Sequence, residues 1–306
     1  MIGFLDYVNK KNYLKYLLYR IAPSFLYKYI IIFAHKKLIG NKINLNKPQK
    51  LSEKIQWLKI YSKDEKKGLL SDKIFVKQYV KSKISDLKCA EIYQIADSFS
   101  NLDFGKLPDN FFIKTNNSWK TNVRVENKNN LTEDDMTRIK NFCEKMLKIN
   151  YAYYNFYELQ YKDIKPKIFC EELLSTSDNI TAVKHYDVWC FNGEPEFIIY
   201  NFLEKMNENE YDSKQYFFDK EWNIVEFYIR YKSVGLVEVS NNKDNILKYA
   251  QILSQNIDFV RVDFMEINGE LYFGEMTFTP YSGFFKVEPE CFDYELGKKL
   301  KIKESW

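Results

Sequence analysis

The chain has 306 residues, of which 45% are apolar and 29% charged, and its formal net charge is +4. This composition predicts a folded protein with one large lobe or two to three smaller ones. Lysine is mixed with aspartate and glutamate instead of forming a basic block, which disfavours nucleic acid as a partner. The chain has two histidines, His35 and His185, so a His-rich zinc site or a catalytic triad is not expected.

The cysteines are five in number, widely spaced and without a C-x-x-C pair. Four of them lie among apolar or aromatic neighbours, which predicts reduced core thiols of a cytoplasmic protein. The five are Cys89, Cys143, Cys170, Cys190 and Cys291.

Residues 12–40 combine aromatic and aliphatic side chains with lysine and arginine, and Pro23 divides them into two predicted helices. The longest apolar run, Ile30–Ala34, is far shorter than the ~20 residues of a membrane span, so we expect a soluble protein. Two interpretations of the helices stay open. Packing on the main body is favoured over peripheral contact with the inner face of the membrane.

Residues 41–50 (NKINLNKPQK) predict a linker, and Ser52 and Ser71 are predicted to cap the two helices that follow. Short apolar runs between Glu91 and Thr115 predict strands, and residues 132–149 have the period of a helix. The remaining predicted elements are a strand over 167–174, a hairpin over 186–201, a second hairpin from Gln215, a helix over 243–255, a third hairpin and a short terminal helix.

The third hairpin reads FVRVDFMEI, then Asn268-Gly269, then ELYFGEMTF. A plain two-residue turn would put Asp263 and Glu275 on opposite faces of the sheet. An odd-length or bulged turn shifts the pairing by one residue and reverses this parity. Polar and apolar residues then separate, which favours the bulged form: Arg261, Asp263, Glu275 and Thr277 on one face, and Val260, Val262, Phe264, Tyr272, Met276 and Phe278 on the other.

Two carboxylates side by side on a sheet face repel each other unless a positive charge lies between them. Mg²⁺ binds one or two carboxylates together with phosphate oxygens, and Arg261 offers a planar fork for a phosphoryl group. The alternative is a solvated face on which Arg261 pairs with Asp263.

This hairpin and the TFTPYSGF that ends it resemble the last segment of ATP-grasp proteins in the teichuronopeptide-biosynthesis branch. Other segments agree with that branch in order, over residues 41–300: NKPQKLSEKIQWLKIY, SDKIFVKQYV, KLPDNFFIKTNN, KPKIFCEELL and DVWCFNGEPEFI. The resemblance implies an α+β ATP-grasp fold, with N-terminal helices and two α+β lobes that sandwich the nucleotide. The expected parts are an N-terminal segment with linker (1–50), a helical region (51–90), a small lobe (91–170) and a C-terminal lobe (171–306).

The resemblance also implies ATP and Mg²⁺ as cofactors and a role for each matching residue. Lys73 and Lys114 match the phosphate-binding lysines, Lys114 and Arg261 are the expected catalytic residues, and Asn116 and Ser118 lie in the phosphate loop. Glu171, Glu172 and Leu174 fall where the family binds adenine and ribose, with Asp178 as a further ribose ligand. The expected metal ligands are Asp263, Glu275 and Thr277.

Two departures from the family pattern stand out. No glycine occurs between Gly105 and Gly193, so the loop over 116–122 (NNSWKTN) lacks the residues that let a backbone approach phosphate closely. In addition, His185 and Asp187 replace an acid and a lysine of the family, so substrate contacts there are not carried over.

The implied reaction is phosphorylation of a carboxylate by ATP and attack of an amine on the acyl phosphate to give an amide. The family branch suggests small-molecule or glycan substrates in bacterial surface polysaccharide biosynthesis, such as capsule, lipopolysaccharide or teichuronic-type polymers. The alternatives are a kinase acting on a sugar or amino acid, a glycosyltransferase of polysaccharide assembly, and an inactive nucleotide-binding protein.

Overall fold

The structure, a computed structural model, describes residues 10–119, 121–174, 183–207 and 210–302. The chain divides into two compact units, each with its own sheet and helices, which confirms the α+β class. Unit 1 comprises residues 1–22, 65–79 and 89–176, and unit 2 comprises residues 23–64, 80–88 and 177–306.

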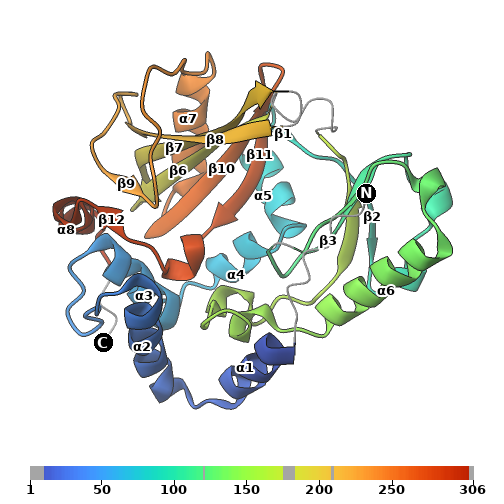
Figure 1. Cartoon of the computed structure of the whole chain (residues 1–306), viewed down its shortest axis with the longest axis horizontal. Helices are drawn as coiled ribbons and strands as arrows, with labels where there is room; N and C mark the ends of the chain where they lie inside the picture. The colour runs from blue at the N-terminus through green and yellow to red at the C-terminus, as the bar shows by residue number, and fades with distance from the viewer. Residues whose placement is uncertain (1–9, 120, 175–182, 208–209, 303–306) are drawn as a thin grey trace. The chain divides into compact units, whose positions relative to one another are not determined.

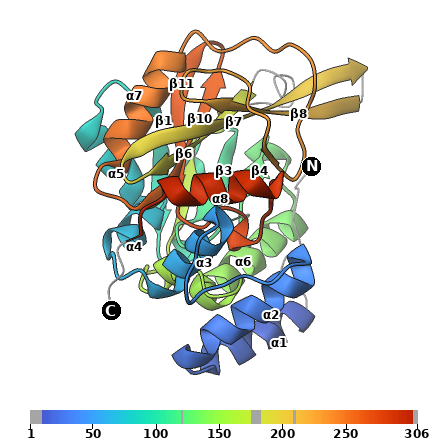
Figure 2. The same cartoon turned by 90° about the vertical axis from the view of Figure 1, so that its left-hand side faces the viewer.

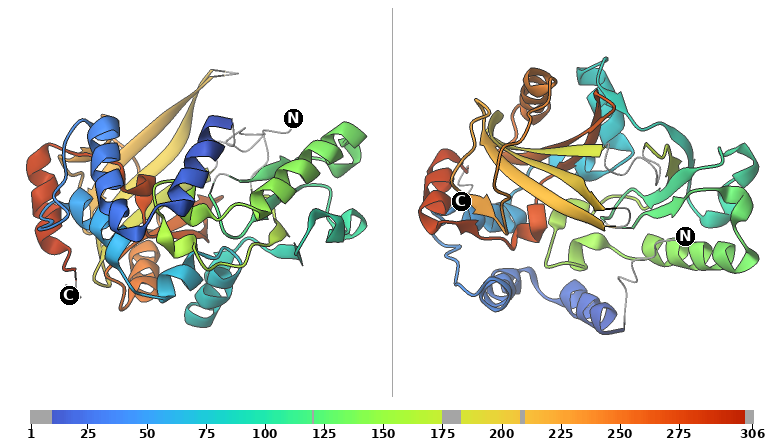
Figure 3. Two further views of the ribbon diagram at one scale, coloured as in Figure 1. Left: turned by 90° about the horizontal axis from the view of Figure 1, so that it is seen from below. Right: turned by 45° about the horizontal axis from the view of Figure 1, so that its top comes forward.

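Unit 1 is built on a four-stranded sheet in the order β2-β5-β3-β4, in which every neighbouring pair is antiparallel. Helix α6 packs on this sheet, as Figure 3 shows, and buries Ile139 and Cys143 in the same apolar cluster as strand residues Phe111 and Ile113. Its strands are β2 (Ile92–Ala96), β3 (Phe111–Thr115), β4 (Val123–Val125) and β5 (Ile168–Glu171), and its helices are α1 (Lys10–Ile21), α4 (Lys66–Ser71) and α6 (Glu133–Leu147).

Short 3₁₀ turns complete unit 1: η2 (Phe99–Asn101), η3 (Phe104–Lys106), η4 (Lys128–Asn130), η5 (Tyr151–Tyr153) and η6 (Leu159–Tyr161). Burial raises the pKa of the Cys143 and Cys170 thiols to about 12, so neither is a ready nucleophile. All five cysteines are free, as predicted, but only Cys143, Cys170 and Cys190 are buried, whereas Cys89 is half-buried and Cys291 is exposed.

Unit 2 contains a six-stranded sheet in the order β1-β11-β10-β6-β7-β8 and a two-stranded sheet of β9 and β12. Helix α5 (Phe75–Lys83) begins in unit 1 and ends in unit 2, and strand β1 (Lys88–Cys89) also spans the boundary. The other strands are β6 (Val183–Phe191), β7 (Glu194–Asn207), β8 (Glu210–Asp219), β9 (Tyr228–Ile229), β10 (Phe259–Ile267), β11 (Glu270–Thr277) and β12 (Val287–Glu288). The helices are α2 (Tyr27–Ile39), α3 (Leu51–Tyr61), α7 (Lys243–Ser254) and α8 (Glu290–Lys299), with 3₁₀ turns η1 (Ser24–Leu26) and η8 (Pro280–Gly283).

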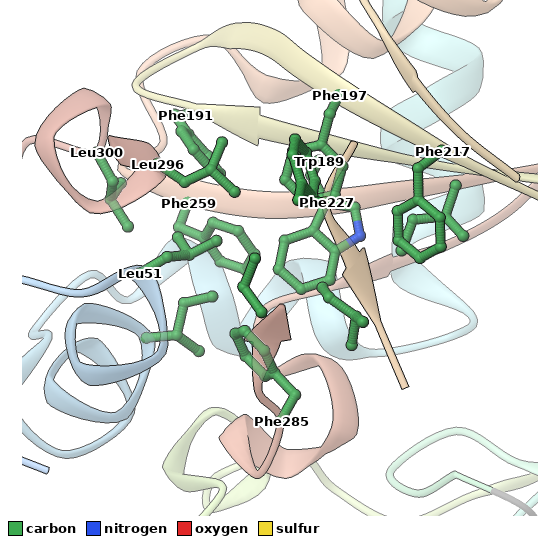
Figure 4. Close-up of a cluster of buried hydrophobic side chains, with 14 of the residues drawn as sticks. Leu51, Trp189, Phe191, Phe197, Phe217, Phe227, Phe259, Phe285, Leu296 and Leu300 are labelled. Carbon is green, nitrogen blue, oxygen red and sulfur yellow. The ribbon is translucent and has the colours of Figure 1, made fainter. Parts of the chain in front are cut away.

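The large sheet of unit 2 is covered differently on its two faces. Helix α7 lies along one face (Figure 1). There the thiol of Cys190 packs near the backbone oxygen of Ala250. At one end of the other face, helices α3 and α8 lie side by side (Figure 2). There Trp189 and Phe259 of the sheet pack with Leu51 and Phe285 in one apolar cluster (Figure 4). The rest of that face carries the polar side chains considered below.

The predicted helices and the hairpins over 186–201 and 259–278 are present, but both predicted serine caps are wrong. The side chain of Ser52 donates to Asp293 of α8 at 2.7 Å, and α3 begins after Lys50. Ser71 ends α4, and Asp72 instead accepts from the backbone N–H groups of Ile74 and Phe75 at the start of α5. Because the hydroxyl of Ser52 is bonded to Asp293, it does not cap the backbone N–H groups of its own helix.

The hairpin predicted from Gln215 is also only partly correct. Strand β8 pairs with β7, but Ile224 makes an isolated bridge to Phe218 and β9 pairs with β12. The residues after β8 therefore join a different sheet, an outcome that local alternation cannot distinguish from a hairpin.

Candidate active site

The predicted shared face of the C-terminal hairpin is confirmed. On β10 and β11, Arg261 pairs with Thr277 and Asp263 pairs with Glu275, so all four side chains project from the same side of the sheet. The shift in register lies inside the hairpin, after Asp263, where Phe264 pairs with Phe273 and leaves Gly274 as an extra residue. The bulge is therefore in strand β11, and the predicted odd or bulged turn is wrong.

The turn itself is a two-residue connection between Ile267 and Glu270. Asn268 and Gly269 have φ values of 53° and 80°, the left-handed conformation that suits a tight hairpin. The position of the bulge also shows that the predicted location of Tyr272 on the apolar face is wrong. Tyr272 pairs with Met265 on the polar face, and Phe273 takes its expected place in the core.

Gly274 is required by the close approach of the two strands at the bulge. A Cβ added there would lie 2.9 Å from the backbone oxygen of Asp263, a distance that real Cβ atoms essentially never show. A glycine lets the two backbones approach without this clash. The same bulge brings Asp263 and Glu275 into register, so the glycine determines the geometry of the acidic pair.

The four polar side chains form one compact network. Arg261 donates through Nε to Asp263 Oδ1 at 2.7 Å and through Nη2 to Asp263 Oδ2 at 2.5 Å. Thr277 Oγ1 donates to Glu275 Oε1 at 2.7 Å, and Arg261 Nη2 lies 3.5 Å from the same oxygen. The guanidinium thus acts as the counter-ion of both acids.

Negative charge exceeds positive charge in this network. Strand β6 places Asp187 directly opposite Asp263 on the same face, so three carboxylates surround one arginine. Burial raises the pKa of Asp263, and Asp187 and Glu275 raise it further against the opposing effect of Arg261. Burial lowers the pKa of Arg261, but the surrounding acids outweigh this and raise it.

The donor set suits a hard cation that completes its shell with phosphate oxygens. Two carboxylates and a hydroxyl converge, and their excess negative charge is of the kind that Mg²⁺ offsets. In the described part of the chain, no three His, Cys, Asp or Glu side chains form a ready-made metal cluster. That is consistent with a site of two carboxylates, because Mg²⁺ seldom has an all-protein cage.

In unit 1, Glu171 at the end of β5 joins two lysines. Glu171 is 5% exposed, and its carboxylate forms ion pairs with Lys114 of β3 and, at 2.5 Å, with Lys77 of α5. Burial raises the pKa of Glu171, but Lys114 and Lys77 outweigh burial and lower it. Burial lowers the pKa of Lys77 despite Glu171.

The glycine-poor loop is held by side-chain hydrogen bonds. Asn116 donates to Asp72 at 2.8 Å and accepts from the backbone N–H of Lys167 at 2.7 Å. The hydroxyl of Ser118 contacts those of Thr115 and Thr121, each at 2.5 Å. In the structure, the side chains of Asn116 and Ser118 therefore bond within unit 1 and order the loop.

Lys73 belongs to the same neighbourhood, because its ammonium donates to the backbone oxygen of Ser118. At the end of β5, Glu172 exchanges hydrogen bonds with the backbone of Glu91, and Leu174 is half-buried. Asp178 lies outside the described residues.

The sequence model of the TupA-like ATP-grasp family matches residues 53–301. The chain belongs to this family. The resemblance found in the sequence is thereby confirmed, and no curated protein sequence matches the chain.

Among solved structures, the chain is similar to several ATP-grasp enzymes. The D-alanine–D-alanine ligase of Bacillus anthracis complexed with ATP is 12% identical, with a TM-score of 0.41 over 69% of this chain and 55% of the ligase. The ATP-grasp ligase PsnB complexed with its minimal precursor is 11% identical, with a TM-score of 0.42 over 82% of this chain and 68% of PsnB. The N5-carboxyaminoimidazole ribonucleotide synthetase of Thermus thermophilus is 12% identical, with a TM-score of 0.36 over 69% of this chain and 45% of the synthetase. The chain thus spans about half the length of the first of these enzymes.

Some residues of this TupA-like chain were missed by sequence reasoning. Lys77 lies in the first turn of α5, and its ion-pair partner Glu171 lies 94 residues further along the chain. Asp187 departs from the family pattern, which therefore implies no role for it. Its position opposite Asp263 follows from strand pairing alone.

Arg230 was also missed, and it lies beside this network. Its guanidinium stacks over the ring of Tyr281 at 4.1 Å, and no ion pair of Arg230 occurs among the described residues. Both residues have left-handed backbones, with φ of 71° for Arg230 and 53° for Tyr281. Burial raises the pKa of Tyr281, whose hydroxyl also feels the charges of Arg261 and Asp187. Strained residues of this kind concentrate at functional sites.

Proposed function

We propose that the chain is an ATP- and Mg²⁺-dependent carboxylate–amine ligase. The γ-phosphoryl group of ATP is transferred to a substrate carboxylate, which breaks the bond to ADP and forms an acyl phosphate. An amine then attacks the acyl carbon, phosphate leaves, and the amine gives up a proton as the amide forms. The proposal rests on the convergence of Arg261, Asp263, Glu275 and Thr277 on one face of a bulged hairpin in a member of the ATP-grasp family.

Each residue has a proposed part in this reaction. Asp263 and Glu275, with Thr277, would hold Mg²⁺, and the bound ion supplies positive charge that offsets the triphosphate. Arg261 would then exchange one carboxylate partner for the transferring phosphoryl group, which it meets as a planar fork. The exchange is favoured because Mg²⁺ would take over from Arg261 the role of offsetting the repulsion among the neighbouring carboxylates.

The lysines of unit 1 have the complementary role. Lys73 and Lys114 are proposed to bind ATP phosphates, and Lys114 is also proposed to stabilise the transferring group. Glu171 fixes Lys114 by a buried ion pair, so it positions a lysine in addition to any contact with the nucleotide. Glu172 and Leu174, which follow β5, are proposed to meet adenine and ribose, with Asp178 as a further ribose ligand.

The proposed carboxylate substrate is a sugar acid of bacterial surface polysaccharide biosynthesis, a context suggested by the name of the family. Arg230 supports an anionic substrate, because its exposed guanidinium has no acid partner in the described part of the chain and could bind a carboxylate. The reaction would take place in the cytoplasm, where ATP is available.

Thermal unfolding with and without Mg-ATP tests the nucleotide site. At 100 times its Kd, Mg-ATP stabilises the protein by about 2.7 kcal/mol, which raises the melting temperature. Glu275→Gln should abolish the Mg²⁺ dependence of this shift. Glu270→Gln is the matched control, because it removes an exposed carboxylate from the same strand and should leave the shift unchanged.

The reaction itself is tested by incubating the enzyme with Mg-ATP, hydroxylamine and D-glucuronate or D-galacturonate. Formation of ADP together with a hydroxamate supports ligation through an acyl phosphate. ADP with a phosphorylated sugar and no hydroxamate would instead identify a kinase. A protein that does not respond to Mg-ATP in either assay contradicts the enzyme proposal.

A further inference from the structure

The N-terminal part of the chain is strongly basic. Residues 7–52 contain no aspartate or glutamate. They carry ten basic residues, while the rest of the chain has a net negative charge: Lys10, Lys11, Lys15, Arg20, Lys28, Lys36, Lys37, Lys42, Lys47 and Lys50. The mixed charge expected from the whole sequence therefore does not describe this segment.

Helix α1 buries one side and exposes an apolar stripe on the other. Tyr16 is buried in an aromatic cluster of unit 1. On the other side, Leu14, Leu18 and Ile21 lie at helical spacing and are exposed, Leu14 by 62% and Ile21 by 77%. Leu17, also exposed, lies within the same stripe.

Helix α2 repeats this pattern within unit 2. Ile31, Ala34 and His35 are buried on one side, where the ring of His35 packs against Phe284. On the other side Phe33 is 71% exposed and Tyr29 62% exposed, one helical turn apart. Nearly half of the exposed large apolar side chains in the described chain lie between residues 13 and 38.

Neither helix has the length of a membrane span. Among the described residues no single helix is long and apolar enough to cross a bilayer, and residues 12–21 and 24–39 meet the criteria only as a bent pair. Helix α2, with 13 residues, is about 20 Å long, less than the ~30 Å hydrocarbon core.

We propose that helices α1 and α2 bind the surface of an anionic phospholipid bilayer through their exposed apolar stripes. Aromatic and aliphatic side chains would enter the headgroup region, and the exposed basic residues of the two helices, Arg20, Lys36 and Lys37, would meet the lipid phosphates. The acid-free run supplies the charge complementarity that identifies this partner. A second copy of the chain fits less well, because two such segments would repel each other. This proposal does not depend on the ligase activity.

Vesicle co-sedimentation of the full-length protein tests the proposal. The protein should bind phosphatidylcholine vesicles that contain phosphatidylglycerol, bind pure phosphatidylcholine vesicles much less, and dissociate as salt is raised. Leu18→Glu and Phe33→Glu should each weaken binding roughly tenfold or more, because each puts a charge in an apolar stripe. Leu236→Glu is the matched control, since Leu236 is fully exposed elsewhere, and its variant should bind like the wild type.

The basic residues are tested separately. Removing Lys36 and Lys37 together by substitution with glutamine should weaken binding about fivefold per charge. The same change at the exposed Lys220 and Lys243 should have no effect. Equal binding to neutral vesicles, or equal binding by Phe33→Glu and the wild type, would overturn the proposal. A dimer in sedimentation velocity that Phe33→Glu dissociates, without vesicle binding, would assign these stripes to a second copy instead.

Because vesicle binding is measured without nucleotide, it can succeed or fail independently of the Mg-ATP shift. Retention of the Mg-ATP shift in Leu18→Glu and Phe33→Glu would show that both variants are folded.

Discussion

Replacing Gly274 with alanine should disturb both the stability of the hairpin and its capacity for Mg²⁺. The added Cβ would lie 2.9 Å from the backbone oxygen of Asp263, 3.4 Å from its carbonyl carbon and 3.5 Å from its Cβ. Two of these atoms belong to the backbone of the neighbouring strand, so no side-chain rotation relieves the clash. Overpacking of this kind costs about 1–3 kcal/mol, which urea unfolding would measure as a lower free energy of unfolding.

The second effect of Gly274→Ala concerns Asp263 and Glu275, which face each other because of the bulge. If the bulge shifts or is lost, their carboxylates separate, and calorimetric titration should show ATP binding that no longer improves with Mg²⁺. Gly269→Ala is the matched control, because φ is 80° and a Cβ there meets nothing within 4 Å. It should cost about 1 kcal/mol through backbone strain and keep the Mg²⁺ dependence. Wild-type stability and Mg-ATP affinity in Gly274→Ala would refute the reasoning.

Two further predictions concern the ion pairs of Glu171 and the exposed Arg230. Glu171→Gln leaves Lys77 and Lys114 without their buried counter-ion and should lower the free energy of unfolding at neutral pH by roughly 3 kcal/mol. The pKa of Glu171 is lowered on folding, so its stabilisation is present above its ordinary value and is lost as the pH falls through the lowered one. Urea unfolding at acid pH should therefore separate wild type and variant less than at neutral pH, and an equal gap would contradict the ion pairs. Arg230→Ala should raise the KM for a uronate roughly tenfold or more with little change in Mg-ATP affinity, whereas an unchanged KM would remove Arg230 from the substrate site.

Much of the hairpin could be predicted from its sequence, because alternation and the Asn268-Gly269 turn are local properties. The demand that polar and apolar residues separate also fixed the relative parity of the two strands. It could not locate the extra residue, since a bulge in the turn and a bulge in strand β11 give the same parity for Asp263 and Glu275. The position became clear only from pairing, and the wrong placement of Tyr272 follows directly from that ambiguity.

Other errors have a common cause in distant partners. Ser52 is an apparent helix cap by its position, but Asp293, far away in the sequence, is the acceptor of its hydroxyl. Lys77 is an ordinary polar position on an amphipathic helix until β5 brings Glu171 to it. Local sequence propensity carries no information about contacts between distant residues. The roles of these side chains are therefore set by the tertiary structure.

The placement of Arg261 connects the two interpretations that the sequence left open for the hairpin. Arg261 pairs with Asp263, as the solvated-face alternative requires, yet the pair is nearly buried and two more acids lie beside it. A single guanidinium cannot balance three carboxylates, so the ion pair and a cation site are compatible states of one network. A divalent ion held by Asp263 and Glu275 would neutralise much of the charge that attracts the guanidinium to Asp263. Arg261 could then bind the transferring phosphoryl group. In the proposed ligase, the ion pair with Asp263 would therefore hold Arg261 next to the place of the transferring phosphoryl group before the nucleotide binds.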